Sequence, residues 1–269
     1  MVQQVWRHPS NKGRRGRALA RAAGYQARAR LLGQRAQVRL GERSRLWVEP
    51  HRAAAVKAVY GNPPDFAEMM VWRQVLRPGD VFLDVGANVG GYSVWAGELG
   101  AEVIALEPAE DTYRLLADNV ALNGFPIRAI RAAAGAACGT ARFTRGNDAL
   151  NRLDPDGSAE VAVVTIDSLI GERVAAGMKI DVEGFEIEVL RGCERALREQ
   201  RIRLIQMEWN HESLPSVGTD RRPVAELLTS CGYRLYRPAT DGRLEPLADL
   251  GFGPDVFAQA TSPEALDYF

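Results

Sequence analysis

The chain has 269 residues, of which 46% are hydrophobic and 25% charged, values typical of a soluble globular protein. Its three cysteines, Cys138, Cys193 and Cys231, stand far apart and include no CxxC pair, which argues against a disulfide framework or a zinc site and fits a reducing compartment. No apolar run approaches the length of a membrane span, and the N-terminus lacks the apolar block of a signal peptide, so we expect a cytoplasmic protein.

The charge is unevenly distributed, although acidic and basic residues are equal in number. Residues 1–57 contain 14 Lys and Arg against two acids, Glu42 and Glu49, which leaves 20 basic residues against 32 acids in the rest of the chain. A basic arm of this kind can bind phosphates, nucleic acid or an anionic membrane surface. Our default interpretation is a solvated helix folded against its own acidic domain, because a charge run specifies no partner. An organelle transit peptide is a further reading, but the serine content is low for one.

The first elements expected are helical and then extended. Residues 13–36 are rich in Ala, Arg and Leu and predict one or two basic helices, and residues 37–48 predict two short strands around a glycine-containing turn. A helix is expected over residues 66–76, closed by Pro78 and Gly79. We therefore separate a basic N-terminal extension, residues 1–57, from a domain of residues 58–269.

Strand and helix patterns alternate from residue 81 onward. The main strands are expected at residues 81–86, 102–108, 127–135, 178–184 and 203–209, with two antiparallel strands of an insertion at 139–145 and 161–167 and two closing strands at 233–237 and 255–260. Helices are expected at residues 92–99, 111–124, 185–197 and 223–231. This alternation predicts an α/β fold, a doubly wound sheet with helices on both faces.

A glycine-rich turn, DVGANVGGYS at residues 84–93, follows the first strand of this sheet. In doubly wound sheets the ligand lies beyond the carboxyl ends of the strands, and Gly86 and Gly90 would let the backbone approach it. A dinucleotide site needs G-x-G-x-x-G, but Asn88 stands at the second glycine position and would fill the space of a pyrophosphate. Asp84 suits a cationic ligand better, because a carboxylate repels a pyrophosphate.

An acidic residue at the end of the second strand completes this ligand site. Glu107 stands seventeen residues after Gly90, where a carboxylate can bind both hydroxyls of a ribose. Asp84, the glycines and Glu107 together indicate an adenosine that carries a positive charge, namely S-adenosylmethionine. A purely structural turn is the alternative, because a glycine-rich turn alone is weak evidence.

Several phrases of the sequence resemble the FkbM-type methyltransferase family: RPGDVFLDVGANVGGYSVWA, VIALEP, VTIDSLI and MKIDVEGFEIEVLRG, with a later ME. MKIDVEG is the most specific of them. The resemblance extends over about residues 1–260, because the opening WRHPSNKGRRGRAL resembles leader segments of some members. It implies a class I S-adenosylmethionine-dependent methyltransferase fold, with a Rossmann-like, seven-stranded, mostly parallel sheet whose last strand is antiparallel.

The same resemblance implies site residues and an activity. The residues that would surround the methionine part of S-adenosylmethionine are Asp84, Gly86, Asn88 and Gly90. Glu107 would hold the ribose, and Ala133 and Ala134, at the end of the third strand, fall where the adenine is usually flanked, although no acid or amide stands there to read its amino group. Family members are mostly associated with O-methylation of sugars, polyketides and other secondary metabolites, so the implied partner is a small hydroxylated acceptor.

Polar side chains interrupt the fourth and fifth main strands. Lys179, Asp181 and Glu183 share one side of the fourth strand, and Gln206, Glu208 and Asn210 share one side of the fifth. In this fold the two strands are neighbours, beside the strand that carries Asp84, so the polar side can face a ligand cavity. A buried Lys179 needs a carboxylate partner, either Asp181 or Glu208. A merely structural ion pair between Lys179 and Glu208 is the alternative.

Methyl transfer to an alcohol requires in-line placement of the acceptor and removal of its proton. We expect Asp181 to be the base or to orient the acceptor, with Glu208 and His211 as the next candidates and Lys179 as the counter-charge. Asp181, Glu183 and Glu208 could instead hold Mg²⁺, which we place second because Lys179 already supplies a positive charge. Asp167 is expected to cap the helix that follows it.

Two other functions stay open. A nucleic-acid methyltransferase or binder could use the basic arm to grip phosphates, but DVEG stands where base-methylating enzymes carry an NPPY-like tetrapeptide, so we do not expect a nucleic-acid partner. A binding module that keeps the fold without the chemistry is the other, and the intact carboxylates argue against it. The acceptor itself depends on loops at residues 145–157 and 211–222, which the sequence does not specify.

Overall fold

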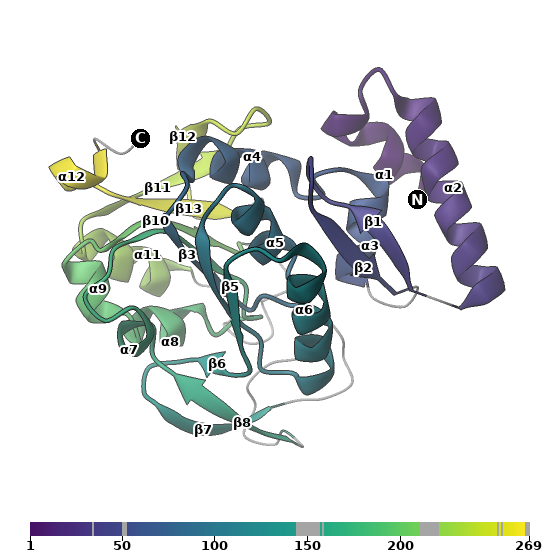
Figure 1. The fold of residues 1–269 in the computed structure, drawn as a ribbon. Helices are drawn as coiled ribbons and strands as arrows, with labels where there is room; N and C mark the ends of the chain where they lie inside the picture. Colours follow the sequence, from purple (N-terminus) through teal and green to yellow (C-terminus); the bar gives the residue numbers. More distant parts are fainter. Residues whose placement is uncertain are drawn as a thin grey trace.

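An eight-stranded sheet forms the centre of the computed structural model, which describes residues 1–33, 35–49, 53–143, 157, 159–209, 221–251, 253 and 255–266 (Figure 1). The strands lie in the order β12-β11-β13-β10-β9-β3-β4-β5. In chain order they are β3 (Val81–Val85), β4 (Glu102–Leu106), β5 (Ile127–Ile130), β9 (Ala175–Ile180), β10 (Ile202–Met207), β11 (Tyr233–Pro238), β12 (Leu244–Pro246) and β13 (Val256–Ala260).

The strand directions are those of the expected class I methyltransferase sheet. Strands β5, β4, β3, β9 and β10 run parallel, and the last strand, β13, is antiparallel to both β10 and β11. The sheet has eight strands and not the expected seven, because the short strand β12 folds back on β11 at the sheet edge. The predicted α/β fold is confirmed.

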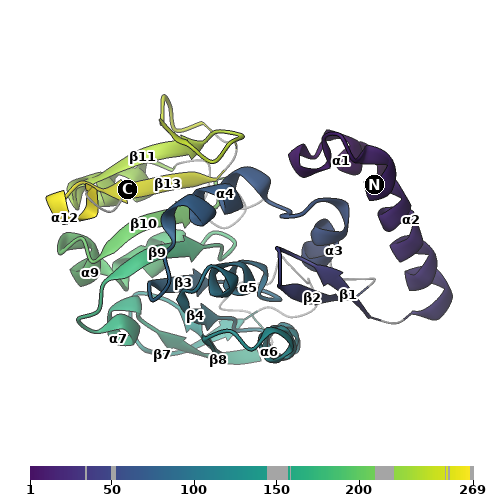
Figure 2. The ribbon, with the colours of Figure 1, turned by 45° about the horizontal axis from the view of Figure 1, so that its top comes forward.

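Helices cover both faces of the sheet (Figure 2). The helices α4 (Phe66–Val75), α5 (Gly91–Glu98) and α6 (Glu110–Asn123) contribute to one hydrophobic cluster. The helices α7 (Ile166–Ile170), α8 (Glu186–Arg191), α9 (Glu194–Arg198), α11 (Arg222–Ser230) and α12 (Pro263–Leu266) contribute to the other. The parallel strands are therefore buried on both sides, as is usual when crossover helices flank a sheet.

Successive residues of a strand point to opposite faces of the sheet. On the face covered by α4, three aromatic side chains pack together: Trp72, Phe82 and Phe257. Phe82 packs edge-on against Trp72 with ring centroids 4.9 Å apart, whereas Leu83 belongs to the opposite cluster. Gly177 on β9 makes room for this tryptophan, because a Cβ there would lie 2.3 Å from its ring. Phe257 of β13 lies 5.7 Å from the same ring. Residues of β3, β9 and β13 therefore surround the Trp72 ring on this face of the sheet.

A second sheet has three strands, β6 (Ala133–Ala134), β7 (Gly139–Phe143) and β8 (Ala159–Val164). It is drawn below the main sheet in Figure 1. The antiparallel pairing of β7 with β8 confirms the predicted insertion. The single strand expected at residues 127–135 is wrong: β5 ends at Ile130, and β6 pairs with β8. Ala133 and Ala134 are therefore buried in the small sheet and do not end the third strand of the large one.

The N-terminal residues form helices α1 (Val2–Arg7) and α2 (Arg15–Leu32), the short 3₁₀ helix η1 (Pro9–Asn11), the antiparallel pair β1 (Ala36–Arg39) and β2 (Arg45–Val48), and helix α3 (Ala53–Tyr60). The predicted basic helix and strand pair are confirmed. The buried residues of α1 and α2 belong to the same hydrophobic cluster as Trp72. The turn between β1 and β2 is tied to α5, because the Glu98 carboxylate accepts the N–H groups of Glu42 and Arg43, each at 2.8 Å. None of the described helices combines the length and apolar character needed to cross a membrane.

Candidate active site

A row of three polar side chains crosses the sheet next to the apolar layer under α4. The register places Asp84 beside Lys179 and Lys179 beside Gln206, on the adjacent strands β3, β9 and β10. All three are buried, with 0%, 6% and 0% of their surface exposed. The sequence prediction that the polar strands are neighbours, beside the strand of Asp84, is therefore correct.

Lys179 lies among carboxylates and over an aromatic ring. Its Nζ donates to Asp181 Oδ2 at 2.7 Å and lies 4.7 Å from the ring centroid of Tyr92. Burial opposes the charge of this ammonium, but Asp181 and Asp84 outweigh it and raise the pKa of Lys179 above its usual range. The ion pair is thus formed with Asp181, and the alternative of a structural pair with Glu208 named the wrong partner.

Gln206 holds a buried polar network together. Its Oε1 accepts from Trp72 Nε1 at 2.5 Å, and its Nε2 donates to Asp255 Oδ2 at 2.6 Å and to Tyr92 Oη at 3.1 Å. Burial raises the pKa of Asp255 to about 7, although the bond from Gln206 lowers it. Trp72, Tyr92 and Asp255 were not predicted from the sequence. The available signals were weak: Tyr92 lies in the glycine-rich phrase, and Asp255 opens the closing strand.

Asp84 has one satisfied and one unsatisfied oxygen. Its Oδ2 accepts from Ser93 Oγ at 2.5 Å, whereas its buried Oδ1 has no hydrogen-bond partner among the described residues. Burial raises the pKa of Asp84, and Lys179 and the Ser93 hydroxyl lower it. Since buried acceptors are almost always paired, the free oxygen indicates a place for a donor from a bound molecule.

The turn after β3 uses the left-handed backbone region repeatedly. Gly86, Asn88 and Gly90 have φ values of 79°, 51° and 89°. A Cβ at Gly86 would lie 1.9 Å from the Asp181 carbonyl oxygen, and one at Gly90 would lie 2.7 Å from the Leu116 side chain. Contacts within the chain thus already require both glycines, so the predicted close approach to a ligand is an additional, untested reason for them.

Glu107 fastens this turn to the end of β4. Its carboxylate accepts the N–H of Ala109 at 2.9 Å and the N–H of Asn88 at 3.0 Å. Burial raises the pKa of Glu107 to about 7 in spite of these two bonds. Each carboxylate oxygen keeps a second acceptor site, so Glu107 can also accept from the two hydroxyls of a ribose.

These residues fit S-adenosylmethionine. The unpaired Asp84 oxygen suits a donor of the methionine part, the remaining acceptor sites of Glu107 suit a ribose, and the surplus of carboxylates suits a sulfonium. Asn88 folds back, with its Oδ1 accepting the N–H of Val89 at 2.8 Å. The adenine-flanking role of Ala133 and Ala134 stays a prediction.

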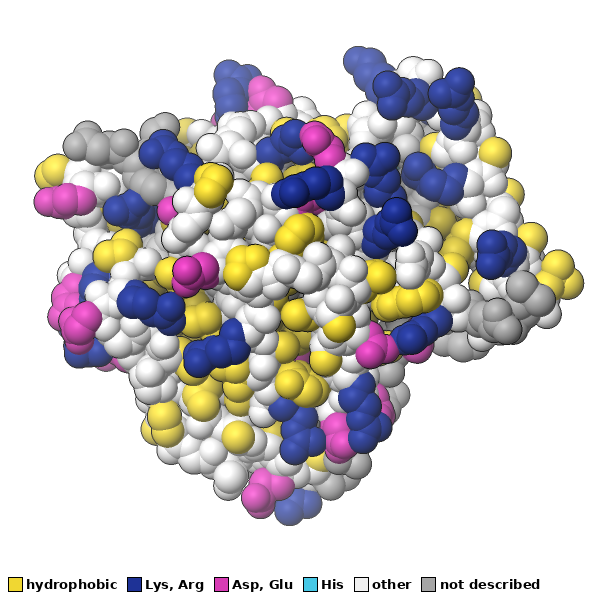
Figure 3. Space-filling model, viewed as in Figure 1, with side chains coloured by type: hydrophobic (Ala, Val, Ile, Leu, Met, Phe, Trp, Pro, Cys, Tyr) yellow, Lys and Arg dark blue, Asp and Glu magenta, His cyan; other side chains and the backbone are white. Residues whose placement is uncertain are grey.

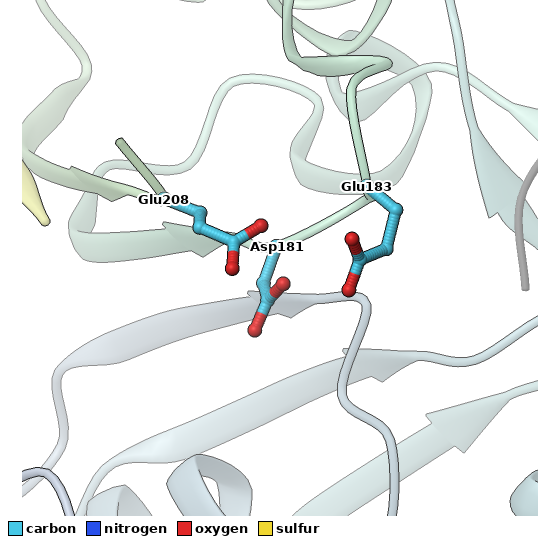
Figure 4. Close-up of side chains that lie close together, drawn as sticks. All are labelled: Asp181, Glu183 and Glu208. Carbon is cyan, nitrogen blue, oxygen red and sulfur yellow. The ribbon is translucent and has the colours of Figure 1, made fainter. Parts of the chain in front are cut away.

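Three carboxylates gather beyond the ends of β9 and β10 (Figure 4). Carboxylate oxygens of Asp181, Glu183 and Glu208 lie within 4.8 Å of one another. Burial, followed by the charges of Asp181 and Glu183, raises the pKa of Glu208 to about 8. One divalent cation could share these oxygens, as the sequence suggested, but acidic clusters of this kind also occur without an ion, and the metal site stays a prediction.

A buried glutamate that the sequence pattern did not single out fixes the turn carrying this cluster. Glu183 and Gly184 have left-handed φ values of 52° and 101°, and the Gly184 N–H donates to Glu186 Oε1 at 3.0 Å. The Oε2 of Glu186 lies 3.5 Å from Nη1 of the buried Arg221. A non-glycine residue at this φ is strained, so these bonds stabilise the conformation that brings Glu183 beside Asp181.

Of the residues to which the sequence assigned a role, His211 is not described and Asp167 caps a different helix from the one expected. His211, Asn210 and most of both acceptor loops lie outside the described residues. The expected capping role of Asp167 is wrong: Thr165 caps α7 by accepting the N–H of Ser168, and the Asp167 carboxylate accepts the N–H groups of Arg195 and Ala196 in α9. The carboxylate therefore caps a helix that is distant in sequence.

Comparisons with known proteins identify the family of the chain. A family model described as the methyltransferase FkbM domain matches residues 84–235, a shorter extent than expected from the sequence phrases. The hexuronic acid methyltransferase AglP of Haloferax volcanii is 28% identical over 56% of this chain and 62% of its own length. The 31-O-demethyl-FK506 methyltransferase FkbM of Streptomyces tacrolimicus is 30% identical over 45% of this chain and 62% of its own length. The chain therefore spans less than two thirds of either relative.

Solved structures resemble the chain more distantly. Precorrin-6y C5,15-methyltransferase of Geobacter metallireducens has a TM-score of 0.42 at 15% identity, over 72% of this chain and 87% of that one. A tRNA (uracil-54, C5)-methyltransferase of Pyrococcus abyssi with S-adenosyl-L-homocysteine has a TM-score of 0.46 at 13% identity, over 85% and 44%. At these scores the resemblance adds nothing to the strand order, which already defines the fold.

Proposed function

The chain belongs to the FkbM methyltransferase family, and from this premise we propose that it transfers the methyl group of S-adenosylmethionine to an oxygen of a small hydroxylated molecule, a sugar or another secondary metabolite. The observation that carries the proposal is that the cofactor turn and the acidic cluster lie in contact at the carboxyl edge of the sheet. A cofactor turn with Asp84 and Glu107 touches the residue that begins the acidic cluster of Asp181, Glu183 and Glu208.

We assign cofactor binding to the turn after β3 and the end of β4. Asp84 would accept from the methionine part, and Glu107 would accept from the ribose hydroxyls. When bound, S-adenosylmethionine supplies an electrophilic methyl group on a positively charged sulfur. The carboxylates around the site favour that charge, and Lys179 keeps their repulsion low.

The acceptor side needs a group that takes a proton. As the C–O bond forms and the C–S bond breaks, the acceptor hydroxyl loses its hydrogen as a proton to a carboxylate of the chain. Asp181, the first candidate from sequence, is held by Lys179 at 2.7 Å. Glu208, with its pKa raised to about 8, is better matched to proton transfer near neutral pH. We therefore propose Glu208 as the proton acceptor and Asp181 as the residue that orients the acceptor.

The acceptor class rests on the acidic and hydrogen-bonding character of the edge. The carboxylates of Asp181, Glu183 and Glu208 can form directed hydrogen bonds with hydroxyl groups, as a sugar would require. The two curated relatives are named for a hexuronic acid and for 31-O-demethyl-FK506, and both names support a small-molecule acceptor. The nucleic-acid alternative gains no support from the residues of the site.

The test is methyl transfer measured by mass. The protein is incubated with deuterated-methyl S-adenosylmethionine and a panel of uronic acids, neutral sugars and macrolide alcohols. Transfer to a hydroxyl gives an ether that survives mild alkali, whereas transfer to a carboxylate gives an ester that does not. We expect a labelled ether, lost in Asp84→Asn and Glu208→Gln and kept in Glu226→Gln, an exposed acid on α11. A labelled ester, or label on RNA alone, would contradict the proposal.

A further inference from the structure

The first 41 residues contain ten Lys and Arg and no acidic residue. This run covers α1, η1, α2 and β1, and Figure 3 shows dark blue side chains gathered over the N-terminal helices. The proposed methyl transfer uses none of these residues. The basic segment therefore calls for a role of its own.

Three arginines on α2 or just before it are not neutralised by carboxylates of the described residues. The helix buries a stripe formed by Ala18, Ala22, Tyr25 and Ala29, which faces α1, α3 and the hydrophobic core. Arg14, Arg17 and Arg28 are exposed, and no carboxylate in the described part of the chain forms an ion pair with them. These arginines face solvent, as expected for the solvated helix of the default interpretation, whereas Arg35 just after the helix pairs with Asp118.

Large apolar side chains are exposed beside the arginines. Val2 and Trp6 are 58% and 51% exposed and stand four residues apart on one face of α1, whereas Val5, just before Trp6, is fully buried. Leu31, near the end of α2, is 82% exposed. The Arg15 guanidinium lies 4.8 Å from the Trp6 ring centroid. Among the described residues, five large apolar side chains are strongly exposed: Met1, Val2, Trp6, Leu31 and Val174. All except Val174 lie on α1, on α2 or, for Met1, just before α1.

We infer that this N-terminal basic surface, formed by Arg14, Arg17, Arg28, Val2, Trp6 and Leu31, docks the protein on an anionic phospholipid membrane. The arginines belong to a segment without acidic residues, so its positive charge matches the negative charge of the lipid headgroups. The exposed tryptophan and aliphatic side chains match the boundary between headgroups and acyl chains, where tryptophan prefers to lie. A phosphate-rich partner such as RNA would be held by the arginines alone, and would leave Val2 and Leu31 without a function.

The test is binding of the full-length protein to phospholipid vesicles. Sedimentation with phosphatidylcholine vesicles that contain roughly a third phosphatidylserine is compared with sedimentation with pure phosphatidylcholine. We expect binding to the anionic vesicles only, weakened by salt. The tryptophan fluorescence of the protein should shift to shorter wavelength on binding, because Trp6 enters the lipid. This shift should be absent in Trp6→Phe.

Two variants separate the contributions of charge and apolar contact. Arg14→Gln/Arg17→Gln/Arg28→Gln should weaken binding by about fivefold for each charge removed, hence about a hundredfold in all. Val2→Gln/Leu31→Gln keeps every charge and should still weaken binding about tenfold. The matched control, Arg128→Gln/Arg173→Gln/Arg234→Gln, removes the same charge from exposed positions on the body and should bind like the wild type.

Several results would overturn the inference. They are equal loss in the control and the N-terminal charge variant, full binding by the Val2→Gln/Leu31→Gln variant, and binding to RNA with no binding to anionic vesicles. Melting temperatures should agree among the variants, because Arg14 makes no side-chain cap to α2 and the replaced side chains are exposed. Vesicle binding does not depend on methyl transfer, so failure of one proposal leaves the other intact.

Discussion

At the scale of single residues, Glu208 is the carboxylate whose surroundings best suit a proton acceptor. Its raised pKa, about 8, means that it loses its proton only as the pH rises through that value. If it accepts the proton of the acceptor, kcat should rise with pH up to about 8 and then level off. Glu208→Gln should lower kcat by roughly 10²–10⁴ and abolish this rise, with little change in cofactor affinity.

The check is a pH–rate profile for Glu208→Gln and for Asp181→Asn. Asp181→Asn removes the partner of Lys179 but leaves the proposed base, so we expect a smaller loss of kcat and a profile that still rises with pH. The exposed Glu226→Gln again serves as control. A wild-type profile in Glu208→Gln would assign the base elsewhere, with Asp181 and His211 as the remaining candidates.

Lys179 is expected to matter for stability as well as for rate. Lys179→Met removes the charge that faces Asp84 and Asp181, and should lower the free energy of unfolding by about 3 kcal/mol, a modest value because Asp181 is partly exposed. The double variant Lys179→Met/Asp181→Asn should recover part of that loss, since it no longer leaves the carboxylate unpaired. Urea unfolding measures both. A double variant that is less stable than Lys179→Met would show that the pair does not act as described.

The sequence predicted the polar residues of single strands but not their partners from other segments. The glycine-rich turn identified Asp84, and strand alternation identified Lys179 and Glu208, because each interrupts or ends an apolar strand. Tyr92, Asp255 and Glu186 were missed, since their roles arise only when α5, β13 and the turn after β9 come together. No pattern within one segment reports such contacts.

At the scale of elements, the carboxyl edge of the sheet should make stability depend on pH. Glu107, Asp255 and Glu208 have folded pKa values of about 7, 7 and 8, above their ordinary values near 4. Between about pH 4.5 and 8 the folded state therefore binds more protons than the unfolded state, so the free energy of unfolding falls as the pH rises. Urea unfolding across this range should show the decline.

The decline should be shallower in Asp255→Asn/Glu208→Gln, because these side chains no longer titrate. S-Adenosylmethionine, whose positive charge favours ionised carboxylates, should also reduce it. Stability that increases steadily from pH 5 to pH 8 in the wild type would contradict the raised pKa values.

Elements with strong local signals were predicted correctly, and those decided by tertiary pairing were not. The hairpin of β1 and β2 and the pair of β7 and β8 followed from alternation around turns. The apolar run at residues 127–135 gave no sign that it divides between two sheets. Strand β12 was missed because a three-residue strand has no periodicity of its own.

At the scale of the whole molecule, the N-terminal extension shares its core with the domain of residues 58–269. Val5, Ala22 and Tyr25 belong to the hydrophobic cluster that contains Trp72. Deleting residues 1–30 should therefore lower the melting temperature by several degrees, since apolar burial is lost. Cofactor affinity of the folded remainder should stay within a few-fold, because every proposed cofactor residue follows Gly79.

Thermal unfolding with and without S-adenosylmethionine tests both statements. The triple arginine variant of α2 is the control, because it keeps the buried stripe while changing the surface. A deletion that leaves the melting temperature unchanged would show that residues 1–30 do not contribute to the shared core.

The contact between Gly86 and the Asp181 carbonyl has a consequence for how the proposed methyltransferase can diversify. The two main-chain segments lie so close that even a methyl group would not fit between them. On the proposed roles, methyl donor and acceptor are therefore spaced by the polypeptide backbone itself. New acceptors can be accommodated by changing side chains around the cluster, but the separation across which the methyl group travels is inherited unchanged by every such variant.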